Sequence, residues 1–226
     1  MSYIWQDFNI KTMPAETIVF RDGVFCPELS TLDSPEISKN YDLPVHIIYV
    51  GKLSDKNNLD INIPENVKNQ TVFLSVRVTV DYGAEFLITI KNSGVESELR
   101  GFVTIQNRGR VKFNVDAHHL AVNTGIFVKT RLVAYKNSTS EINGTAHIYK
   151  YCENARSDIQ MSAIAEKSAK IIFRPAQKIS SIPESAAHGA NIAHYTAPQI
   201  EYLHQSGLND TDIDKVLKEA FLNDID

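Results

Sequence analysis

Two histidine positions in the sequence carry side chains that could bind a metal ion or transfer a proton. His118 and His119 are adjacent and follow residues 111–116, where apolar and polar side chains alternate. Successive side chains of a strand point to opposite faces, so at most one of these imidazoles faces a given site. A protein-bound metal ion needs three or four converging ligands, which this spacing does not supply. We interpret the pair as partly exposed histidines at a strand end.

The second position is His188, in the motif Ala187-His188-Gly189-Ala190. It lies between the last predicted strand and a helical tail. Gly189 lets another part of the backbone pass closely and leaves the imidazole accessible. A neutral imidazole there could ligate iron or relay a proton. Because one accessible ring is fewer than the ligands a metal needs, a structural or solvated histidine remains an alternative.

Cysteine and carboxylate chemistry has weaker support. Cys26 and Cys152 are the only cysteines, and no C-x-x-C spacing occurs, which argues against a disulfide scaffold, a zinc finger or a cysteine-ligated cluster. Cys152 is either a small buried filler or a reactive thiol, with Lys150 as slight support for a thiolate. Glu96 and Glu98 would share a strand face, where exposed acidic alternation is the commoner explanation. The glycine-rich phosphate motifs and G-x-S-x-G are absent, so nothing here predicts an enzyme.

Composition narrows the classes further. The chain has 226 residues, 43% of them hydrophobic and 22% charged, and a net charge of -4. This charge gives no general attraction to nucleic acid or to an anionic membrane surface. Residues 1–11 lack the basic start and apolar stretch of a secretory signal, and no apolar run approaches the length of a membrane span. We expect a soluble, cytoplasmic protein with neither a nucleic acid nor a membrane as partner.

The elements that must position these residues are mostly strands. Residues 1–44 are an irregular lead-in with one hairpin predicted over residues 17–25, where Asp22-Gly23 is a strong turn signal. Residues 45–195 form the predicted β core, with at least eight strands and no clear helix between them. This pattern alone allows a sandwich, a barrel or a β-solenoid. The predicted strands lie at residues 45–50, 72–80, 86–90, 99–105, 111–115, 127–135, 142–149 and 169–173.

Residues 196–226 change to a helical period. Thr196-Ala197-Pro198-Gln199 is a capping box, which predicts a helix start, and Gly207 supplies the left-handed residue that ends this helix. A second helix follows, capped by Asp210 or Thr211. Two short amphipathic helices must pack on the β core or on a partner. The apolar stripe predicted for the second helix consists of Ile213, Val216, Leu217, Ala220 and Phe221.

Taken together, these segments resemble the SufB/SufD core family of iron–sulfur cluster assembly. The early segment at residues 18–25 is similar to the stretch that precedes the core in SufD, which favours SufD over SufB. The order of the later motifs carries most of the resemblance. They are His118-His119, the strands over residues 127–149, Tyr151-Cys152-Glu153-Asn154-Ala155-Arg156, Ala165-Glu166-Lys167-Ser168-Ala169, Pro175, Ala187-His188-Gly189-Ala190 and Tyr202-Leu203-His204-Gln205-Ser206-Gly207-Leu208.

The resemblance implies a right-handed parallel β-helix closed by C-terminal helices. It implies a non-enzymatic subunit that pairs with a SufB-like chain and a SufC-like ATPase, and that holds an iron–sulfur cluster only transiently within the complex. His188 matches the histidine of the SufD C-terminal motif, which faces SufB and is a candidate for handling iron or a nascent cluster. The implied ATPase-docking residues are Tyr202, Leu203, Gly207, Leu208 and Phe221.

The sequence also departs from the family pattern. Ser206 stands where the family usually has arginine, which could weaken the ATPase contact. The long helical N-terminal region of SufD has no counterpart, and neither does the cysteine that SufB contributes to its cluster site. A shortened SufD is therefore expected rather than a scaffold that holds a cluster alone.

Two other functions stay open at this point. A β-solenoid carbohydrate-active or carbohydrate-binding protein would need a groove of clustered carboxylates and aromatic side chains, together with export. A degenerate paralogue could instead form a homodimer, because exposed β-solenoid edges favour pairing with a second copy.

Overall fold

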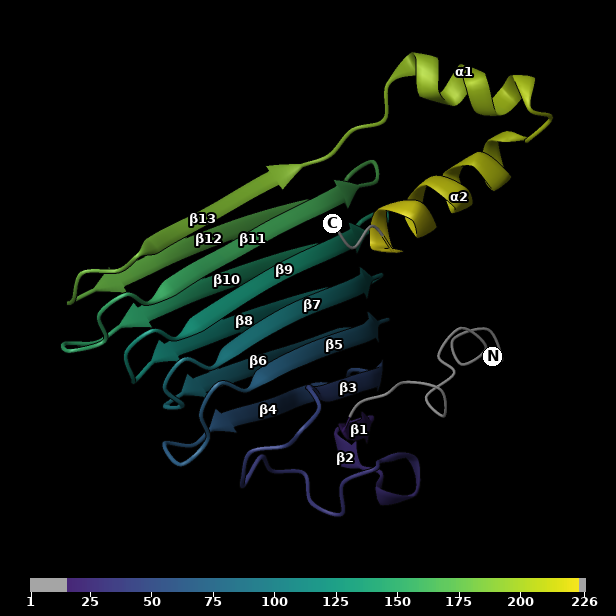
Figure 1. Ribbon diagram of the computed structural model, residues 1–226. Coiled ribbons are helices and arrows are strands. Elements are labelled where there is room, and N and C mark those ends of the chain that lie inside the picture. Colours follow the sequence, from purple (N-terminus) through teal and green to yellow (C-terminus); the bar gives the residue numbers. More distant parts are fainter. Residues whose placement is uncertain (1–15, 224–226) are drawn as a thin grey trace.

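The computed structural model describes residues 16–223, so the ends of the predicted lead-in and of the predicted helical segment lie outside the described residues. The chain forms parallel strands first and two helices last (Figure 1). The strands are β1 (Glu16–Arg21), β2 (Val24–Phe25), β3 (Val45–Lys52), β4 (Asp55–Ile63), β5 (Thr71–Val80), β6 (Gly83–Asn92), β7 (Glu98–Asn107), β8 (Arg110–His119), β9 (Gly125–Ala134), β10 (Thr139–Ile148), β11 (Arg156–Ala165), β12 (Lys170–Ile179) and β13 (Ser185–Ile192). A short 3-10 helix, η2 (Pro27–Leu29), follows β2, and the α-helices are α1 (Ala197–Gln205) and α2 (Asp210–Asn223).

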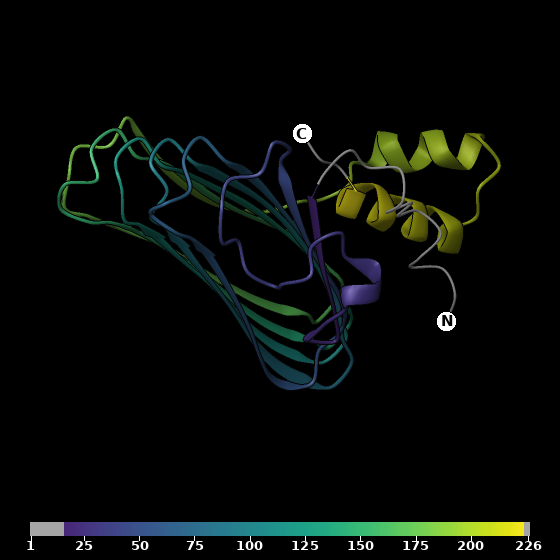
Figure 2. The ribbon, with the colours of Figure 1, turned by 60° about the horizontal axis from the view of Figure 1, so that its bottom comes forward.

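Successive strands alternate between two sheets. The larger sheet has the order β13-β11-β9-β7-β5-β3-β1-β2, and the smaller sheet has the order β12-β10-β8-β6-β4. Apart from the β1–β2 hairpin, every pairing is parallel, and each strand pairs with the strand two further along the chain. The chain is therefore a right-handed parallel β-helix with two strands in each coil, which confirms the fold expected from the resemblance. Figure 2 shows the two sheets as separate layers, with α1 and α2 outside them.

The core lies between the two sheets and is filled by the inward half of each strand's alternation. In β5, the even-numbered residues from Val72 to Val80 are buried, while the side chains between them are partly exposed. Because parallel register stacks like positions, each inward side chain lies on its counterpart one coil away. Phe86 and Phe113 form one such contact, with ring centroids 5.7 Å apart. Tyr49 of the other sheet packs across the core, with its ring centroid 5.0 Å from that of Phe86.

Three strands were missed in the sequence: β4, β11 and β13. Their residues are rich in Asp, Asn, Ser, Ala and Gly, which have low strand propensity. They are extended because each pairs along its length with the strand of the preceding or following coil. His188 consequently lies within β13, and not in the connection predicted after the last strand. Tertiary pairing overrides local propensity in all three.

The N-terminal end of the β-helix is covered by the chain's own lead-in. The predicted hairpin is confirmed: β1 and β2 pair antiparallel, and Asp22 and Gly23 at the turn both have positive φ. The polar link after the hairpin packs Ile37 into the core. Asn40 exchanges hydrogen bonds with the backbone of Lys68, 2.8 Å to the Lys68 N and 3.0 Å to its carbonyl oxygen. This link is therefore a cap and not a flexible connection.

The C-terminal helices leave the sheets after β13 and form an antiparallel pair (Figure 1). α1 begins with the expected capping box at Thr196, and Gly207, with φ +86°, follows its end. The cap of α2 is Asn209, whose Oδ1 accepts a hydrogen bond from the Asp212 N at 3.0 Å, and is neither Asp210 nor Thr211. Within the described part of the chain, neither helix is long and apolar enough to cross a membrane.

Candidate functional site

The C-terminal end of the β-helix is formed by β12 and β13, the edge strands of the two sheets. No further coil of the described chain covers them, so several isoleucines are accessible. Two of these, Ile179 and Ile192, are in register with the buried Ile148 and Ala163 and would be core in an inner coil. Ile182, in the turn between these strands, is 79% exposed, and Ile172, Ile179 and Ile192 are each 44% exposed. We call β12, β13 and their connecting turn the open end. Its long edges carry unpaired backbone groups beside apolar side chains, a combination typical of a surface that another strand covers.

His188 lies in the middle of β13 at this open end. Its register partner on β11 is Ile159, a fully buried core residue. Partners in a parallel ladder point to the same side, so His188 belongs to the inward row of the β-helix. The imidazole is nevertheless exposed, because no coil follows. A Cβ on the neighbouring Gly189 would lie 2.3 Å from Oε1 of Gln160, so the end of the Gln160 side chain occupies the space beside this glycine.

His118 and His119 point to opposite faces of β8, as predicted. His119 is fully buried, and its Nδ1 lies 2.9 Å from Oγ1 of Thr124. Thr124 donates its own hydroxyl proton to the carbonyl of Ala121 at 3.1 Å, so it accepts from His119. Burial, and then the nearby His118, lower the pKa of His119 to about 4, which keeps this ring neutral. His119 is therefore a core histidine and not the partly exposed one expected from the sequence.

The other candidate nucleophile and acids also have structural roles. Cys152 is buried, and its thiol donates a hydrogen bond to the His119 carbonyl at 3.1 Å. Burial raises the pKa of this thiol, which opposes thiolate formation and supports the filler interpretation. Glu96 adopts positive φ in a turn, while Glu98 begins β7 and pairs with Arg156 at 3.2 Å. The two carboxylates do not share a strand face, which corrects that expectation.

The C-terminal helices differ in how they contact the sheets. α2 packs against β9 and β11, where Phe221 and Leu222 join Val133 and Ile164 in a buried cluster. The guanidinium of Arg131 lies 5.0 Å from the centre of the Phe221 ring. Phe221, one of the predicted docking residues, therefore makes an intramolecular contact. Val216 and Ala220, assigned to the apolar stripe, are exposed, whereas Lys218 is buried.

Lys218 explains why the buried face of α2 is rotated from the predicted stripe. Its ammonium pairs with Glu166, before β12, and lies 2.5 Å from Oδ2 of Asp214. It also lies 5.0 Å from the centre of the Tyr135 ring. Burial alone would lower the pKa of Lys218, but the hydrogen bonds to the two carboxylates raise it above its usual value. A charged lysine thus joins the helix to the β-helix.

α1 contributes nothing buried. Tyr202 is 69% exposed, Leu203 and Leu208 are partly exposed, and Gly207 lies in the turn to α2 with no atom near the position of a Cβ. Four of the five predicted docking residues therefore lie on an accessible helix and turn. They form a surface separate from the open end, beyond the ends of the strands (Figure 1).

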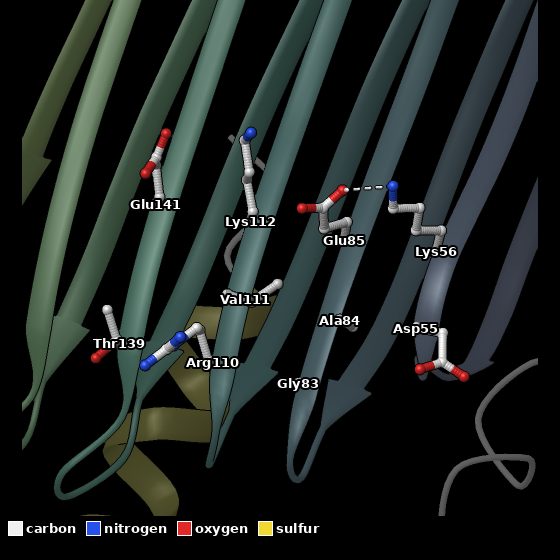
Figure 3. Close-up of a pocket in the computed structure, with 10 residues that line it drawn as sticks. All are labelled: Asp55, Lys56, Gly83, Ala84, Glu85, Arg110, Val111, Lys112, Thr139 and Glu141. Atoms are coloured by element: carbon white, nitrogen blue, oxygen red, sulfur yellow. Dashed lines mark ion pairs between the residues drawn. The ribbon is translucent and has the colours of Figure 1, made fainter.

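A broad pocket lies on the outer face of the smaller sheet, and Figure 3 shows it. Along it, Lys56, Glu85, Lys112 and Glu141 occupy the same register position on β4, β6, β8 and β10. Opposite charges alternate, so each carboxylate has a cationic neighbour, and this ladder stabilises the sheet. None of the ten lining residues is aromatic. The pocket therefore lacks the aromatic side chains expected of a carbohydrate site, and its carboxylates Glu85 and Glu141 lie in a ladder of alternating charge.

One cluster was missed in the sequence. Asp116, His118 and His147 come together on the outer face of the smaller sheet, with their ligand atoms within 4.8 Å of one another. His147 is the register partner of His118 in the next coil. The sequence signal was the coil length: ladder partners lie 27 residues apart at Val72 and Leu99, and 31 apart at Ile126 and Ser157. Because consecutive strands belong to different sheets, this period relates every second strand.

Comparison with known proteins agrees with this architecture. The family model described as "SUF system FeS cluster assembly, SufBD core domain" matches residues 66–221. The match runs from before β5 into α2 and so includes the open end, His188 and α1. No curated protein matches the chain at a significant level. The family match covers well over half of the sequence, and the chain belongs to the SufBD core-domain family of the SUF iron–sulfur cluster assembly system.

Proposed function

We propose that this chain is a SufD-like, non-enzymatic subunit of a cytoplasmic SUF complex. It pairs with a SufB-like scaffold through the open end, and its α1 surface contacts a SufC-like ATPase. The observation that carries the proposal is the asymmetry of the β-helix. One end is capped by the chain's own lead-in, while the other leaves β12, β13 and their isoleucines exposed.

Pairing at the open end has a clear physical basis. An added strand satisfies the unpaired edge groups of β12 or β13, and burial of apolar surface contributes about 25 cal/mol per Å². Ile182 and Ile192 would become core residues of such an interface. The inward position of His188 also turns it toward the chain that completes the β-helix. A SufB-like subunit with the same coil geometry supplies a matching edge.

The chain alone is poorly suited to hold a cluster. Iron–sulfur clusters are commonly held by several cysteine thiolates, whereas both Cys26 and Cys152 are buried. His188 offers one imidazole at that end. We therefore propose that the cluster, as the cargo of assembly, is held between subunits, with His188 contributing one ligand or a proton.

Contact with the ATPase is assigned to Tyr202, Leu203 and Leu208, with Gly207 setting the turn. Phe221 acts indirectly in this scheme, because its packing against the β-helix holds α2 and thereby orients α1. Such a helix pair suits transmission of movement: it presents apolar side chains to a partner while one of its helices is joined to the sheet.

The proposal is tested by anaerobic co-expression with the SufB-like and SufC-like proteins, followed by affinity purification and assay of iron and acid-labile sulfide. His188→Ala should leave the complex intact and lower both contents. His194→Ala is the matched control, because His194 is also exposed but lies after β13. Ile182→Asp should abolish pairing with the SufB-like chain, and Tyr202→Ala should weaken ATPase recovery only. Absence of a complex with wild type would refute the proposal.

A homodimer is the second candidate, favoured by the same exposed edge. Two open ends could pair with each other when the SufB-like partner is absent. Light scattering of the chain, alone and mixed with the SufB-like protein, distinguishes the cases. A dimer that exchanges into the heteromeric complex supports the first proposal. A dimer that persists in the mixture favours self-pairing.

A further inference from the structure

A compact group of side chains lies on the outer face of the smaller sheet, on strands inside the edge strand β12. It consists of Asp116 and His118 on β8 and His147 and Tyr149 at the end of β10. The two imidazoles stack with their centroids 4.6 Å apart and an interplanar angle of 10°. Their side chains are each only 16% exposed, and Asp116 is 40% exposed. None of these residues has a part in the proposed function.

The three ligand groups converge as a metal site requires. Nε2 of His147 lies 2.8 Å from Oδ1 of Asp116, and Nε2 of His118 lies 3.2 Å from Oδ2 of the same carboxylate. Two ligands bound about 2.0–2.1 Å from a tetrahedral metal ion are separated by about 3.3 Å. Both imidazole-to-carboxylate distances are thus within about half an ångström of that separation, and the three ligand atoms all lie within 4.8 Å of one another. Rotation of the side chains would bring them to one ion.

Tyr149 fixes the orientation of one ligand. Its hydroxyl oxygen lies 3.0 Å from Nδ1 of His118. When Nδ1 carries the proton and donates it to Tyr149, the lone pair of Nε2 is directed at Asp116 and available to a metal ion. Metal-binding histidines are commonly held in this way by a hydrogen bond from their second nitrogen. The cluster thus contains three candidate ligands and a tyrosine that forms a hydrogen bond with one of them.

The framework under the cluster is rigid. β8 lies between β6 and β10, and β10 lies between β8 and β12, so neither strand is an edge. Sites built on paired strands hold ligand positions more accurately than sites on loops. Lys91 and Lys178 are the register neighbours of His118 and His147 and lie on the same face. Both are exposed, and water screens their repulsion of a cation.

We propose that Asp116, His118 and His147 bind one divalent transition-metal ion through two imidazole nitrogens and one carboxylate. Imidazole with carboxylate suits Zn²⁺, Fe²⁺ or Co²⁺, and the set leaves at least one coordination position for water or a ligand from a partner. This site is independent of His188: it lies on the outer face of the smaller sheet, whereas His188 is in the inward row of the larger sheet.

The test uses the whole chain after treatment with a chelator. Zn²⁺ is titrated by calorimetry, and Co²⁺ binding is followed by visible absorption, which reports the coordination number. Wild type should bind one equivalent, with Co²⁺ bands typical of four or five ligands. His147→Ala and Asp116→Asn should each weaken binding at least about tenfold, and Tyr149→Phe should weaken it by a smaller factor because the outer hydrogen bond is lost.

His194→Gln is the matched control, since it removes an exposed histidine outside the cluster and should bind Zn²⁺ as wild type does. Circular dichroism and thermal denaturation confirm that each variant is folded. The proposal is overturned if wild type binds no Zn²⁺, if His147→Ala binds as tightly as wild type, or if His194→Gln loses as much affinity. The cluster would then be a hydrogen-bonded stack that only stabilises the sheet.

Discussion

The two ends of the β-helix solve the same physical problem in different ways. Both ends expose strand edges and one layer of core side chains. At the N-terminal end, the lead-in folds back, buries Ile37 and pairs its polar groups with the first coils. At the C-terminal end, the chain leaves from β13 and places its helices beside the sheet, so the open end keeps its isoleucines accessible. Capping thus depends on where the flanking chain is placed.

The difference extends to the polar groups. In the cap, Gln70 accepts a hydrogen bond from the Tyr41 N at 2.9 Å and donates one to the Leu43 carbonyl at 3.0 Å. These bonds replace water on groups that the cap covers. At the open end, His188 and the edge of β13 remain exposed. A capped end stabilises a single chain, and an open end allows assembly.

The largest expected effect is on the stability of the cap. Ile37→Ala should lower the free energy of unfolding by about 3 kcal/mol, because Ile37 is only 5% exposed and its loss leaves a cavity. Ile182→Ala at the open end should change it by less than about 0.5 kcal/mol in the isolated chain. Urea denaturation measures both. Equal losses would show that the open end is already covered, for example by a second copy.

The next effect concerns the attachment of α2 near the open end. Lys218→Met should cost about 2 kcal/mol, because Glu166 and Asp214 lose their shared cation, although their partial exposure limits the cost. Lys215→Met is the control. Lys215 is exposed, and its Nζ lies 4.0 Å from Oε1 of Glu219, which makes a weaker ion pair than those of Lys218. Hydrogen exchange should show faster exchange in α2 for the first variant alone. Unchanged protection of α2 would contradict the assigned role of Lys218.

Two tyrosine hydroxyls, Tyr49 in the capped half and Tyr195 beside α2, lower the stability at alkaline pH, and they differ in their hydrogen bonding at neutral pH. Burial, and then the charge of Asp22, raise the pKa of Tyr49 to about 12. The folded state keeps the proton while the unfolded chain releases it near pH 10, so stability falls as pH rises from 10 to 12. The loss should be about 1 kcal/mol between pH 9 and pH 11.

Tyr49→Phe should remove the part of this pH dependence that comes from Tyr49. It should leave the free energy of unfolding at pH 7 unchanged, because the Tyr49 hydroxyl is buried with no hydrogen-bond partner. Tyr195, whose pKa burial also raises to about 12, donates a hydrogen bond to the Leu217 carbonyl at 2.7 Å. Tyr195→Phe should therefore cost about 1 kcal/mol at pH 7. Denaturation curves at pH 7, 9 and 11 check both variants, and an identical cost at pH 7 would refute the distinction.

The smallest expected effect lies in the middle coils, between the two ends. Glu85→Lys places three lysines in register and should cost about 0.5 kcal/mol at low salt, and less at high salt. Glu85→Gln should cost still less, because it removes the attraction without adding repulsion. Urea denaturation at two salt concentrations is the measurement. A salt-independent loss would mean that the charge ladder is not its cause.

Local rules in the sequence determined several elements of this protein. Asp22-Gly23 specifies the hairpin turn, Thr196 and Gly207 bound α1, and strict alternation identifies β5 and β8 with their buried and exposed faces. Each of these depends on the conformations and burial of a few neighbouring residues. The opposite directions of His118 and His119 followed from the same rule. The fold name itself came from the order of motifs, since alternation alone did not distinguish a β-helix from a sandwich.

Other features were decided only by tertiary structure. β13 is a strand because it pairs with β11. The position of His188 therefore depends on hydrogen bonding between two strands that are far apart in the sequence. His118 meets His147 because one coil places them in register, and a charged Lys218 is buried because Glu166 lies opposite. In each case the energy comes from a partner about one coil or more away along the chain. Local propensity and periodicity carry no information about that partner.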